Sequence, residues 1–168
     1  MSAQTLFPTI RTGIGREGHR FLPMESTKFC VIGGILFEDC PGLAADSDGD
    51  VVFHALCNAI TSLTGVSILA GIAEDLCHKD GITDSQVYLE AALKTMGRQK
   101  ITHVAIAIEG KRPDLQDRLS EMKTKIAAIM GLQPSQVGIT VSSGDGLTDF
   151  GCGEGVQAFA CVTTQENV

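Results

Sequence analysis

The chain has 168 residues, of which 43% are hydrophobic and 20% charged, and its 13 basic and 20 acidic side chains give a formal net charge of −7. This length and composition are typical of one globular domain that folds without disulfides or a structural metal. The acidic balance disfavours general binding to nucleic acid or to an anionic membrane.

The N-terminal segment, the apolar runs and the cysteine spacing indicate in which compartment the protein works. No apolar run approaches the roughly 18 residues of a membrane span, and no basic segment followed by an apolar one marks the N-terminus. Six cysteines are widely spaced without a C-x-x-C pair. We therefore expect a cytoplasmic protein with reduced, mostly buried thiols and no cysteine-only zinc site.

Strands and helices alternate along the chain, which predicts one sheet with helices packed on it. Hydrophobic periodicity predicts strands at 9–15, 28–37, 101–108, 137–142 and 156–163, and helices at 47–64, 84–96 and 113–130. The segment 66–83 is expected to be a loop with some helix. We expect a single domain over 1–168, with residues 1–8 as a flexible extension.

The helix predicted at 47–64 carries signals at both ends. Ser47 and Asp50 have the spacing of a capping box, and Gly65 is a suitable stop. His54 lies four residues after Asp50 on a polar stripe of this helix. Its apolar face is formed by Val52, Leu56, Ala59, Ile60 and Leu63.

A candidate metal site combines Glu17 and His19 with His54. Glu17 and His19 follow a predicted glycine-containing turn at 13–15, and residues two apart in an extended chain project to the same side. One carboxylate and two imidazoles with an open fourth position form the layout of a catalytic zinc site. The spacing equally fits a surface histidine at 19 and a histidine at 54 that is hydrogen-bonded to Asp50.

Three loops carry groups that suit phosphate. The acids of D-S-D-G-D at 46–50 fit either simple helix capping or a phosphate site at a helix N-terminus; a calcium loop is disfavoured because the later glutamate is missing. E-G-K-R-P at 109–113 fits a phosphate- or base-binding loop or a solvated turn. The serines and glycines at 142–146 and 151–155 fit a diphosphate site with magnesium at Asp145, or a hairpin connection.

Taken in order, these blocks resemble the 2-C-methyl-D-erythritol 2,4-cyclodiphosphate synthase family from about Gly13 to Thr163. The most specific block is S-D-G-D-V at 47–51, followed by H-A-L at 54–56. The resemblance implies an α/β (α+β) subunit with a mixed four-stranded sheet, helices packed on one side, and a homotrimer with active sites between subunits. No nucleic acid or membrane partner is implied.

The implied activity is that of a metal-dependent phosphorus–oxygen lyase of the non-mevalonate isoprenoid pathway. In the implied reaction, the 2-phosphate of 4-diphosphocytidyl-2-C-methyl-D-erythritol 2-phosphate attacks the β-phosphate of the same molecule, and CMP leaves. The product is 2-C-methyl-D-erythritol 2,4-cyclodiphosphate.

The resemblance also assigns roles by position. Glu17, His19 and His54 would bind the first metal, expected to be zinc, with Asp50 orienting His54 from behind. Asp145 would meet a second cation, magnesium or manganese, that accompanies the diphosphate. The implied substrate-binding residues are Asp46, Ser47, Asp75, Ser85, Gly110, Lys111, Arg112, Ser142 and Ser143. The implied catalytic group is Asp46, Ser47, Ser143 and Asp145.

The chain departs from the family pattern at several of these positions. Glu17 stands for the usual aspartate, Asp46 for a histidine, and Cys152 for an arginine. A carboxylate facing a diphosphate is repulsive unless a cation lies between them. The alternatives are therefore a catalytically weak trimeric relative that binds metal or cytidine nucleotides as a regulatory protein, or a metal-binding structural subunit. The presence of all three candidate metal ligands, Glu17, His19 and His54 (the metal trio), favours an active enzyme over these alternatives.

Overall fold

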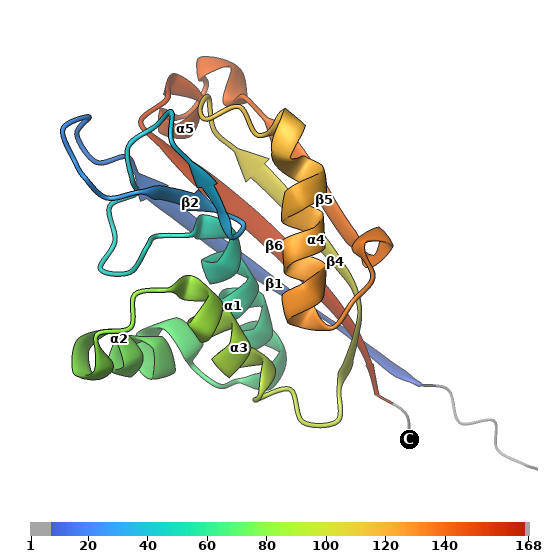
Figure 1. Cartoon of the computed structure of the whole chain (residues 1–168). Coiled ribbons are helices and arrows are strands. Elements are labelled where there is room, and N and C mark those ends of the chain that lie inside the picture. Colours follow the sequence, from blue (N-terminus) through green and yellow to red (C-terminus); the bar gives the residue numbers. More distant parts are fainter. Residues whose placement is uncertain (1–7, 167–168) are drawn as a thin grey trace, which may run out of the picture.

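The computed structural model describes residues 8–166, and its main element is a four-stranded mixed sheet (Figure 1). The expected flexible extension at 1–8 lies outside the described residues except for Pro8. In spatial order the strands are β1 (Thr9–Arg20), β6 (Gly155–Glu166), β4 (Lys100–Glu109) and β5 (Val137–Ser142). β1 and β4 run antiparallel to β6, and β5 runs parallel to β4. The mixed four-stranded sheet is therefore confirmed.

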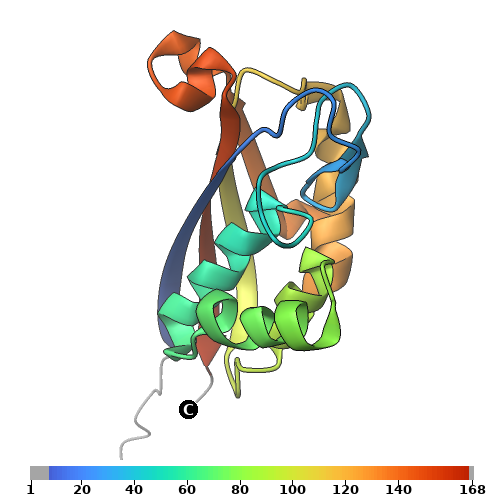
Figure 2. The same ribbon diagram turned by 90° about the vertical axis from the view of Figure 1, so that its left-hand side faces the viewer.

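Helices cover one face of this sheet, as expected, and Figure 2 shows the sheet nearly edge-on with the helices on one side. The larger helices are α1 (Val51–Thr64), α3 (Ser85–Leu93) and α4 (Leu119–Met130). α1 packs on β1 and β6, α4 packs on β5, and α3 contacts both α1 and α4. Because α1 lies between the sheet and α3, its residues 51–57 are all buried.

Two glycines of β1 allow α1 to approach the sheet closely. A Cβ atom on Gly15 would lie 2.0 Å from the carbonyl oxygen of Ala55, and one on Gly13 would lie 2.2 Å from that of Ala59. The expectation of a turn at 13–15 is therefore wrong: β1 continues to Arg20. The glycines are required by helix packing, and the longer strand carries Glu17 and His19 along its inner face.

A small hairpin forms a second sheet above α1. β2 (Cys30–Ile32) and β3 (Ile35–Phe37) pair antiparallel through a turn at Gly33 and Gly34, whose φ values are +62° and +75°. Two consecutive positive φ values are typical of a tight hairpin turn and favour glycine. The sequence predicted one strand with a bend here, and the structure has two strands.

Several helix ends differ from the sequence prediction. α1 begins at Val51, with Asp50 as its N-cap, instead of at Ser47; its end at Gly65 is confirmed. α4 begins at Leu119, after a 3-10 turn at Gln116–Arg118 in which the Asp114 carboxylate accepts a hydrogen bond from the Gln116 amide. Because this hydrogen bond favours a turn, the α-helix begins later than residue 113, where it was predicted to start.

The segment predicted as a loop with some helix is mostly helical. It contains a π-helical turn, η1 (Ile68–Ala73), followed directly by α2 (Glu74–Asp80). The helix predicted to reach residue 96 ends at Leu93. No single described helix is long and apolar enough to cross a membrane; α1 and the segment 68–80 meet that criterion only as a pair bent by 117°.

Candidate active site

Three predicted metal ligands meet where β1 passes the first turn of α1. Glu17 and His19 project from the inner face of β1, and His54 projects from α1. One ligand atom from each side chain lies within 4.8 Å of the other two. His19 Nε2 is 3.3 Å from His54 Nδ1. The structure therefore brings the trio together in a geometry that could hold a metal ion.

The electrostatic surroundings keep both imidazoles available as ligands. Burial, reinforced by the neighbouring His19, lowers the pKa of His54 to about 4. Burial also lowers the pKa of His19, against the opposing charge of Glu17. Neutral imidazoles have a free lone pair, and two of them with one carboxylate suit a divalent cation such as zinc. The donor set thus fits the implied metal, and Glu17 reaches it despite its extra methylene.

A buried relay behind His54 was not foreseen from the sequence. Ser85 Oγ lies 2.8 Å from His54 Nε2, and the same hydroxyl donates a hydrogen bond to the Asp48 carboxylate. Ser47 Oγ lies 3.2 Å from the same nitrogen. If Nε2 carries the proton, Nδ1 presents its lone pair toward His19 and Glu17, as a metal ligand must.

The structure places Ser85 behind His54. Its side chain is fully buried at the start of α3, where it contacts His54 and Asp48, and its expected contact with the substrate stays a prediction. The acidic alternation at 46–50 did mark Asp48, but only the fold shows that its partner is Ser85, 37 residues away.

Asp50 does not orient His54, so that expectation is wrong. Its fully buried carboxylate accepts hydrogen bonds from the amides of Val52 and Phe53 in α1 and from those of Gly33 and Gly34 in the hairpin turn. Burial raises the pKa of Asp50 to about 7, with Asp48 adding to the shift and the amide donors opposing it. Because Asp50 occupies the first amides of α1, this helix end is not a free phosphate site.

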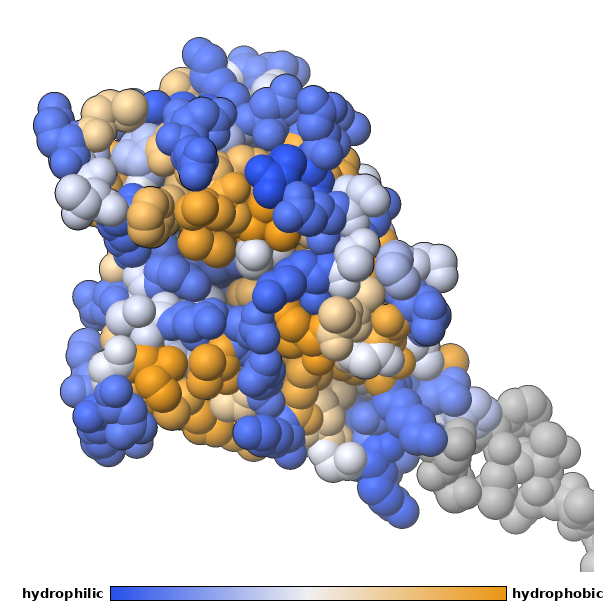
Figure 3. Space-filling model, in the orientation of Figure 1, coloured by the Kyte–Doolittle hydropathy of each residue, from blue (hydrophilic) through white to orange (hydrophobic). Residues whose placement is uncertain are grey.

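Glu17 and His54 of the metal trio line a pocket of about 370 Å³. Figure 2 looks onto this side, where the loop before α1 lies above η1 and α2. In Figure 3, hydrophobic residues gather around the hairpin and around the η1–α2 segment, with hydrophilic residues between them. The lining residues are Glu17, Ala45, Asp46, Ser47, His54, Leu69, Ala70, Ala73, Glu74, Cys77, His78 and Tyr88.

Two of the expected substrate residues, Asp46 and Ser47, line this pocket, and Asp75 does not. The Asp75 carboxylate instead pairs with Lys79 one helical turn along α2, at 2.8 Å. The neighbouring residue Glu74 lines the pocket instead of Asp75.

A second pocket of about 450 Å³ lies at the other predicted phosphate loops. It is lined by Lys111, Ser143, Asp145, Gly146, Gly151 and Cys152. Ser143 Oγ donates to Asp145 Oδ1 at 2.9 Å, and Asp145 has a positive φ of 45°. This arrangement exposes the Asp145 carboxylate at the rim.

The remaining residues of these loops have structural contacts. Ser142 ends β5: its carbonyl accepts from the Gly110 amide, and its hydroxyl from the Gly144 amide. The Arg112 guanidinium lies 4.7 Å from the centre of the Phe21 ring and donates to the Gly153 carbonyl. These contacts hold the loop at 109–113 against the start of β6.

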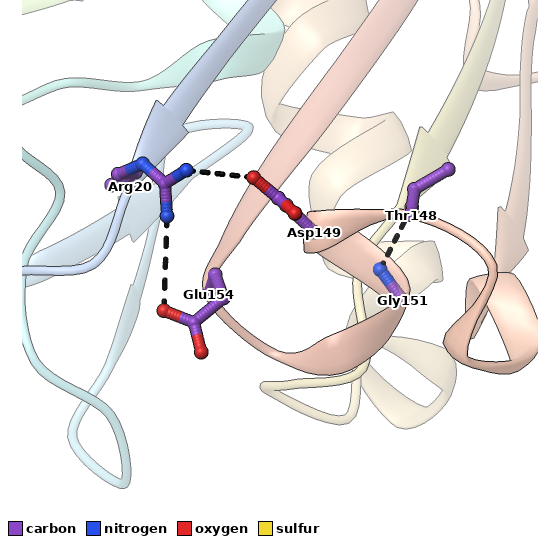
Figure 4. Close-up of polar contacts among 5 residues, drawn as sticks. All are labelled: Arg20, Thr148, Asp149, Gly151 and Glu154. Carbon is purple, nitrogen blue, oxygen red and sulfur yellow. Dashed lines mark hydrogen bonds and ion pairs between the residues drawn. The ribbon is translucent and has the colours of Figure 1, made fainter.

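The second pocket is also tied to the end of β1 (Figure 4). Arg20 pairs with Asp149 at 2.6 Å, in α5 (Asp149–Cys152), and with Glu154 at 3.7 Å. Thr148 caps α5 by accepting a hydrogen bond from the Gly151 amide. Such exposed ion pairs are worth at most about 1 kcal/mol each. They set the position of α5 relative to the strand that carries Glu17 and His19.

Comparison with known proteins identifies the family. A family profile described as the YgbB family matches residues 10–165. The 2-C-methyl-D-erythritol 2,4-cyclodiphosphate synthase of Chlamydia caviae is 52% identical over 157 residues, covering 93% of this chain and 89% of the relative. The chain belongs to the 2-C-methyl-D-erythritol 2,4-cyclodiphosphate synthase family.

Solved structures agree with this assignment. A structure titled as a 2-C-methyl-D-erythritol 2,4-cyclodiphosphate synthase in a CDP-bound form is 26% identical, with a TM-score of 0.80, and the match covers 92% of this chain and 99% of that one. The bifunctional IspDF of Campylobacter jejuni has a TM-score of 0.85 at 24% identity. That match covers 95% of this chain and 43% of the bifunctional protein, so the chain spans less than half of that protein's length.

In this chain, the predicted site residues are divided between two pockets. Glu17, His54 and Ser47 line one pocket, whereas Lys111 and Asp145 line another, and no described residue lines both. The implied catalytic group is thus not assembled in one cavity of one subunit.

Proposed function

We propose that this chain converts 4-diphosphocytidyl-2-C-methyl-D-erythritol 2-phosphate to 2-C-methyl-D-erythritol 2,4-cyclodiphosphate with release of CMP. Two findings support the proposal: membership of the synthase family, and the Glu17–His19–His54 cluster, of which Glu17 and His54 line a pocket of about 370 Å³. The cluster is the structural observation on which the proposal depends. The other described residues of the pocket wall include no lysine or arginine that could polarise a phosphate.

In the proposed site, Glu17, His19 and His54 hold zinc, and Asp145 faces the magnesium or manganese that accompanies the diphosphate. When bound, these cations polarise phosphate oxygens and neutralise charge that develops on the leaving group. Ser85 and Asp48 fix the tautomer and the orientation of His54, so the nitrogen that faces Glu17 stays unprotonated.

The reaction requires no protein nucleophile. An oxygen of the 2-phosphate forms a bond to the β-phosphorus, while the bond from that phosphorus to the oxygen that bridges to the α-phosphate breaks. CMP leaves with that oxygen. The protein's part is to hold the attacking and leaving groups in line, as in other phosphoryl transfers. Ser47 lines the metal pocket, and Lys111 and Ser143 line the second pocket, where they offer donors to the phosphates.

We further propose a homotrimer in which the metal pocket of one subunit faces the second pocket of its neighbour. The outer face of the sheet supports this assembly, because helices leave it uncovered and it carries exposed apolar residues. Ile14 of β1 is 67% exposed and Phe159 of β6 is 39% exposed, and both line a hollow of about 390 Å³ on that face. Exposed apolar patches of this kind mark interaction surfaces.

The assembly is tested by the mass of Phe159→Asp in solution. The charged side chain should prevent burial of this face, so light scattering at micromolar concentration should give the monomer mass. Met24→Asp, at a 66% exposed residue beside the hairpin, should keep the trimer mass. A trimer that survives Phe159→Asp would contradict this interface.

The activity is tested by turnover. The purified protein is given the diphosphocytidyl substrate with zinc and magnesium, and with a chelator as control. CMP release together with a cyclic diphosphate is the expected result. A folded, zinc-loaded protein that releases no CMP would refute the proposal and favour a regulatory protein that binds metal or cytidine nucleotides.

A further inference from the structure

The metal pocket has an unfavourable charge for a phosphate ligand. Its described wall contains three carboxylates, Glu17, Asp46 and Glu74, and neither lysine nor arginine. Glu17 belongs to the metal cluster, but Asp46 and Glu74 do not. A phosphate in this pocket therefore needs a further N–H donor in the wall, beyond the metal cluster.

His78 is placed to supply that N–H donor. It projects from the last turn of α2 into the same pocket, with its Nε2 atom 3.8 Å from Asp46 Oδ2. Both side chains are exposed, at 59% and 82%, so either can turn toward a ligand.

Lys28 is another basic residue near Asp46, but its ammonium group is already hydrogen-bonded to backbone carbonyls. Its ammonium donates to the carbonyls of Leu43 and Ala45, each at 2.7 Å, from behind the loop that carries Asp46. It is not among the described residues that line the pocket. Lys28 thus shapes the loop, and His78 is left as the pocket-facing partner of Asp46.

We propose that His78 is a phosphate-binding residue of this chain, which pairs with Asp46 and donates an N–H to a phosphate of the substrate. In this arrangement the His78 ring lies between the Asp46 carboxylate and the phosphate, and it separates the two negatively charged groups. The identity of the full substrate rests on the proposed function, whereas the recognition of a diphosphate group does not.

The pairing makes a specific prediction about single and double variants. In the zinc-loaded protein, His78→Ala should raise both the dissociation constant for CDP and the KM for the substrate by about tenfold, the value of one charge-assisted hydrogen bond. The turnover number should change less, because the metal cluster is intact. His78→Lys should restore much of the affinity.

Asp46→Asn in the His78→Ala background should also restore affinity, because it removes the carboxylate that the His78 ring separates from the phosphate. A merely structural role of His78 would not be rescued by a change at residue 46. The matched control is Lys79→Ala, which removes a neighbouring positive charge of α2 that is paired with Asp75. It should leave CDP affinity within about twofold of wild type.

Inorganic pyrophosphate serves as a second probe, because it lacks the cytidine and should show the same dependence on His78. Unchanged affinity for CDP and pyrophosphate in His78→Ala would overturn the proposal, and so would failure of the wild-type protein to bind either probe. If the wild type binds CDP through His78 but releases no CMP from the substrate, the proposed function fails while this inference stands.

Discussion

The two pockets of the chain are held in different ways. Around His54, buried side chains from α1, α3 and the preceding loop bond to one another, and His54 itself is only 6% exposed. Around Asp145, the side chains are exposed, and the main polar contact, from Ser143, lies within the same loop.

This difference separates a pre-organised site from an adaptable one. Metal ligands must be fixed before the ion binds, and buried hydrogen bonds provide that order within one chain. An exposed loop keeps side-chain freedom that a ligand or a neighbouring subunit must restrict on binding. The geometry of the metal pocket should therefore depend on residues that are distant in the sequence. The geometry of the Asp145 pocket should depend on the ligand or the neighbouring subunit that binds there.

The largest effect is expected from His54→Ala. Loss of one of three protein ligands should lower zinc affinity by roughly two to three orders of magnitude and bring CMP release below detection. A competition titration with a chromogenic chelator measures the affinity, and His103→Ala, at an exposed strand histidine, is the matched control. CMP release that persisted in His54→Ala would show that the trio is not the catalytic metal site.

Asp50→Ala tests how far the metal pocket depends on buried backbone contacts. The change leaves the amides of Val52, Phe53, Gly33 and Gly34 without their acceptor, so we expect a loss of about 3–5 kcal/mol in the free energy of unfolding. Urea unfolding at fixed protein concentration measures it. Asp39→Ala, at an exposed acid in the loop that follows β3, should cost less than about 0.5 kcal/mol.

The same contrast explains what the sequence could predict. The strand at 137–142 is confirmed residue for residue, and the end of α1 at Gly65 is confirmed, because alternation and a C-terminal glycine are local signals. The four-stranded sheet and the family were accessible because the motif blocks at 47–56 are specific.

Contacts between distant segments could not be predicted in this way. Gly13 and Gly15 suggested a turn, whereas the structure requires glycine there because α1 packs against them, and the contacting residues Ala55 and Ala59 lie 40 and 46 positions later. Asp50 was assigned to His54 by its helical spacing, whereas its carboxylate is occupied by hairpin amides from residues 33 and 34. Periodicity reports which face a residue is on, and not which partner the fold brings to that face.

Ser85→Ala probes the relay behind His54 without touching a ligand. Removal of the hydroxyl leaves His54 Nε2 without its 2.8 Å partner and breaks its link to Asp48, so the imidazole tautomer is less well fixed. Outer hydrogen bonds of this kind are worth about 10- to 100-fold in metal affinity. The chelator titration should show a loss in that range, and Ser120→Ala, at an exposed serine of α4, should show none. Unchanged zinc affinity in Ser85→Ala would mean that the metal site does not depend on this relay.

The smallest structural effect is expected at the exposed pocket, from Asp145→Asn. Asparagine tolerates the positive φ of this residue, so the free energy of unfolding should stay within about 0.5 kcal/mol of wild type. Zinc affinity at the trio should also be unchanged, because the two pockets share no described residue. Turnover at limiting magnesium should nevertheless fall by about tenfold or more, since a neutral amide holds a divalent cation less strongly than a carboxylate does. A loss of stability or of zinc affinity in Asp145→Asn would show that the two pockets are coupled within one chain. The separation between a pre-organised metal site and an adaptable phosphate loop would then be wrong.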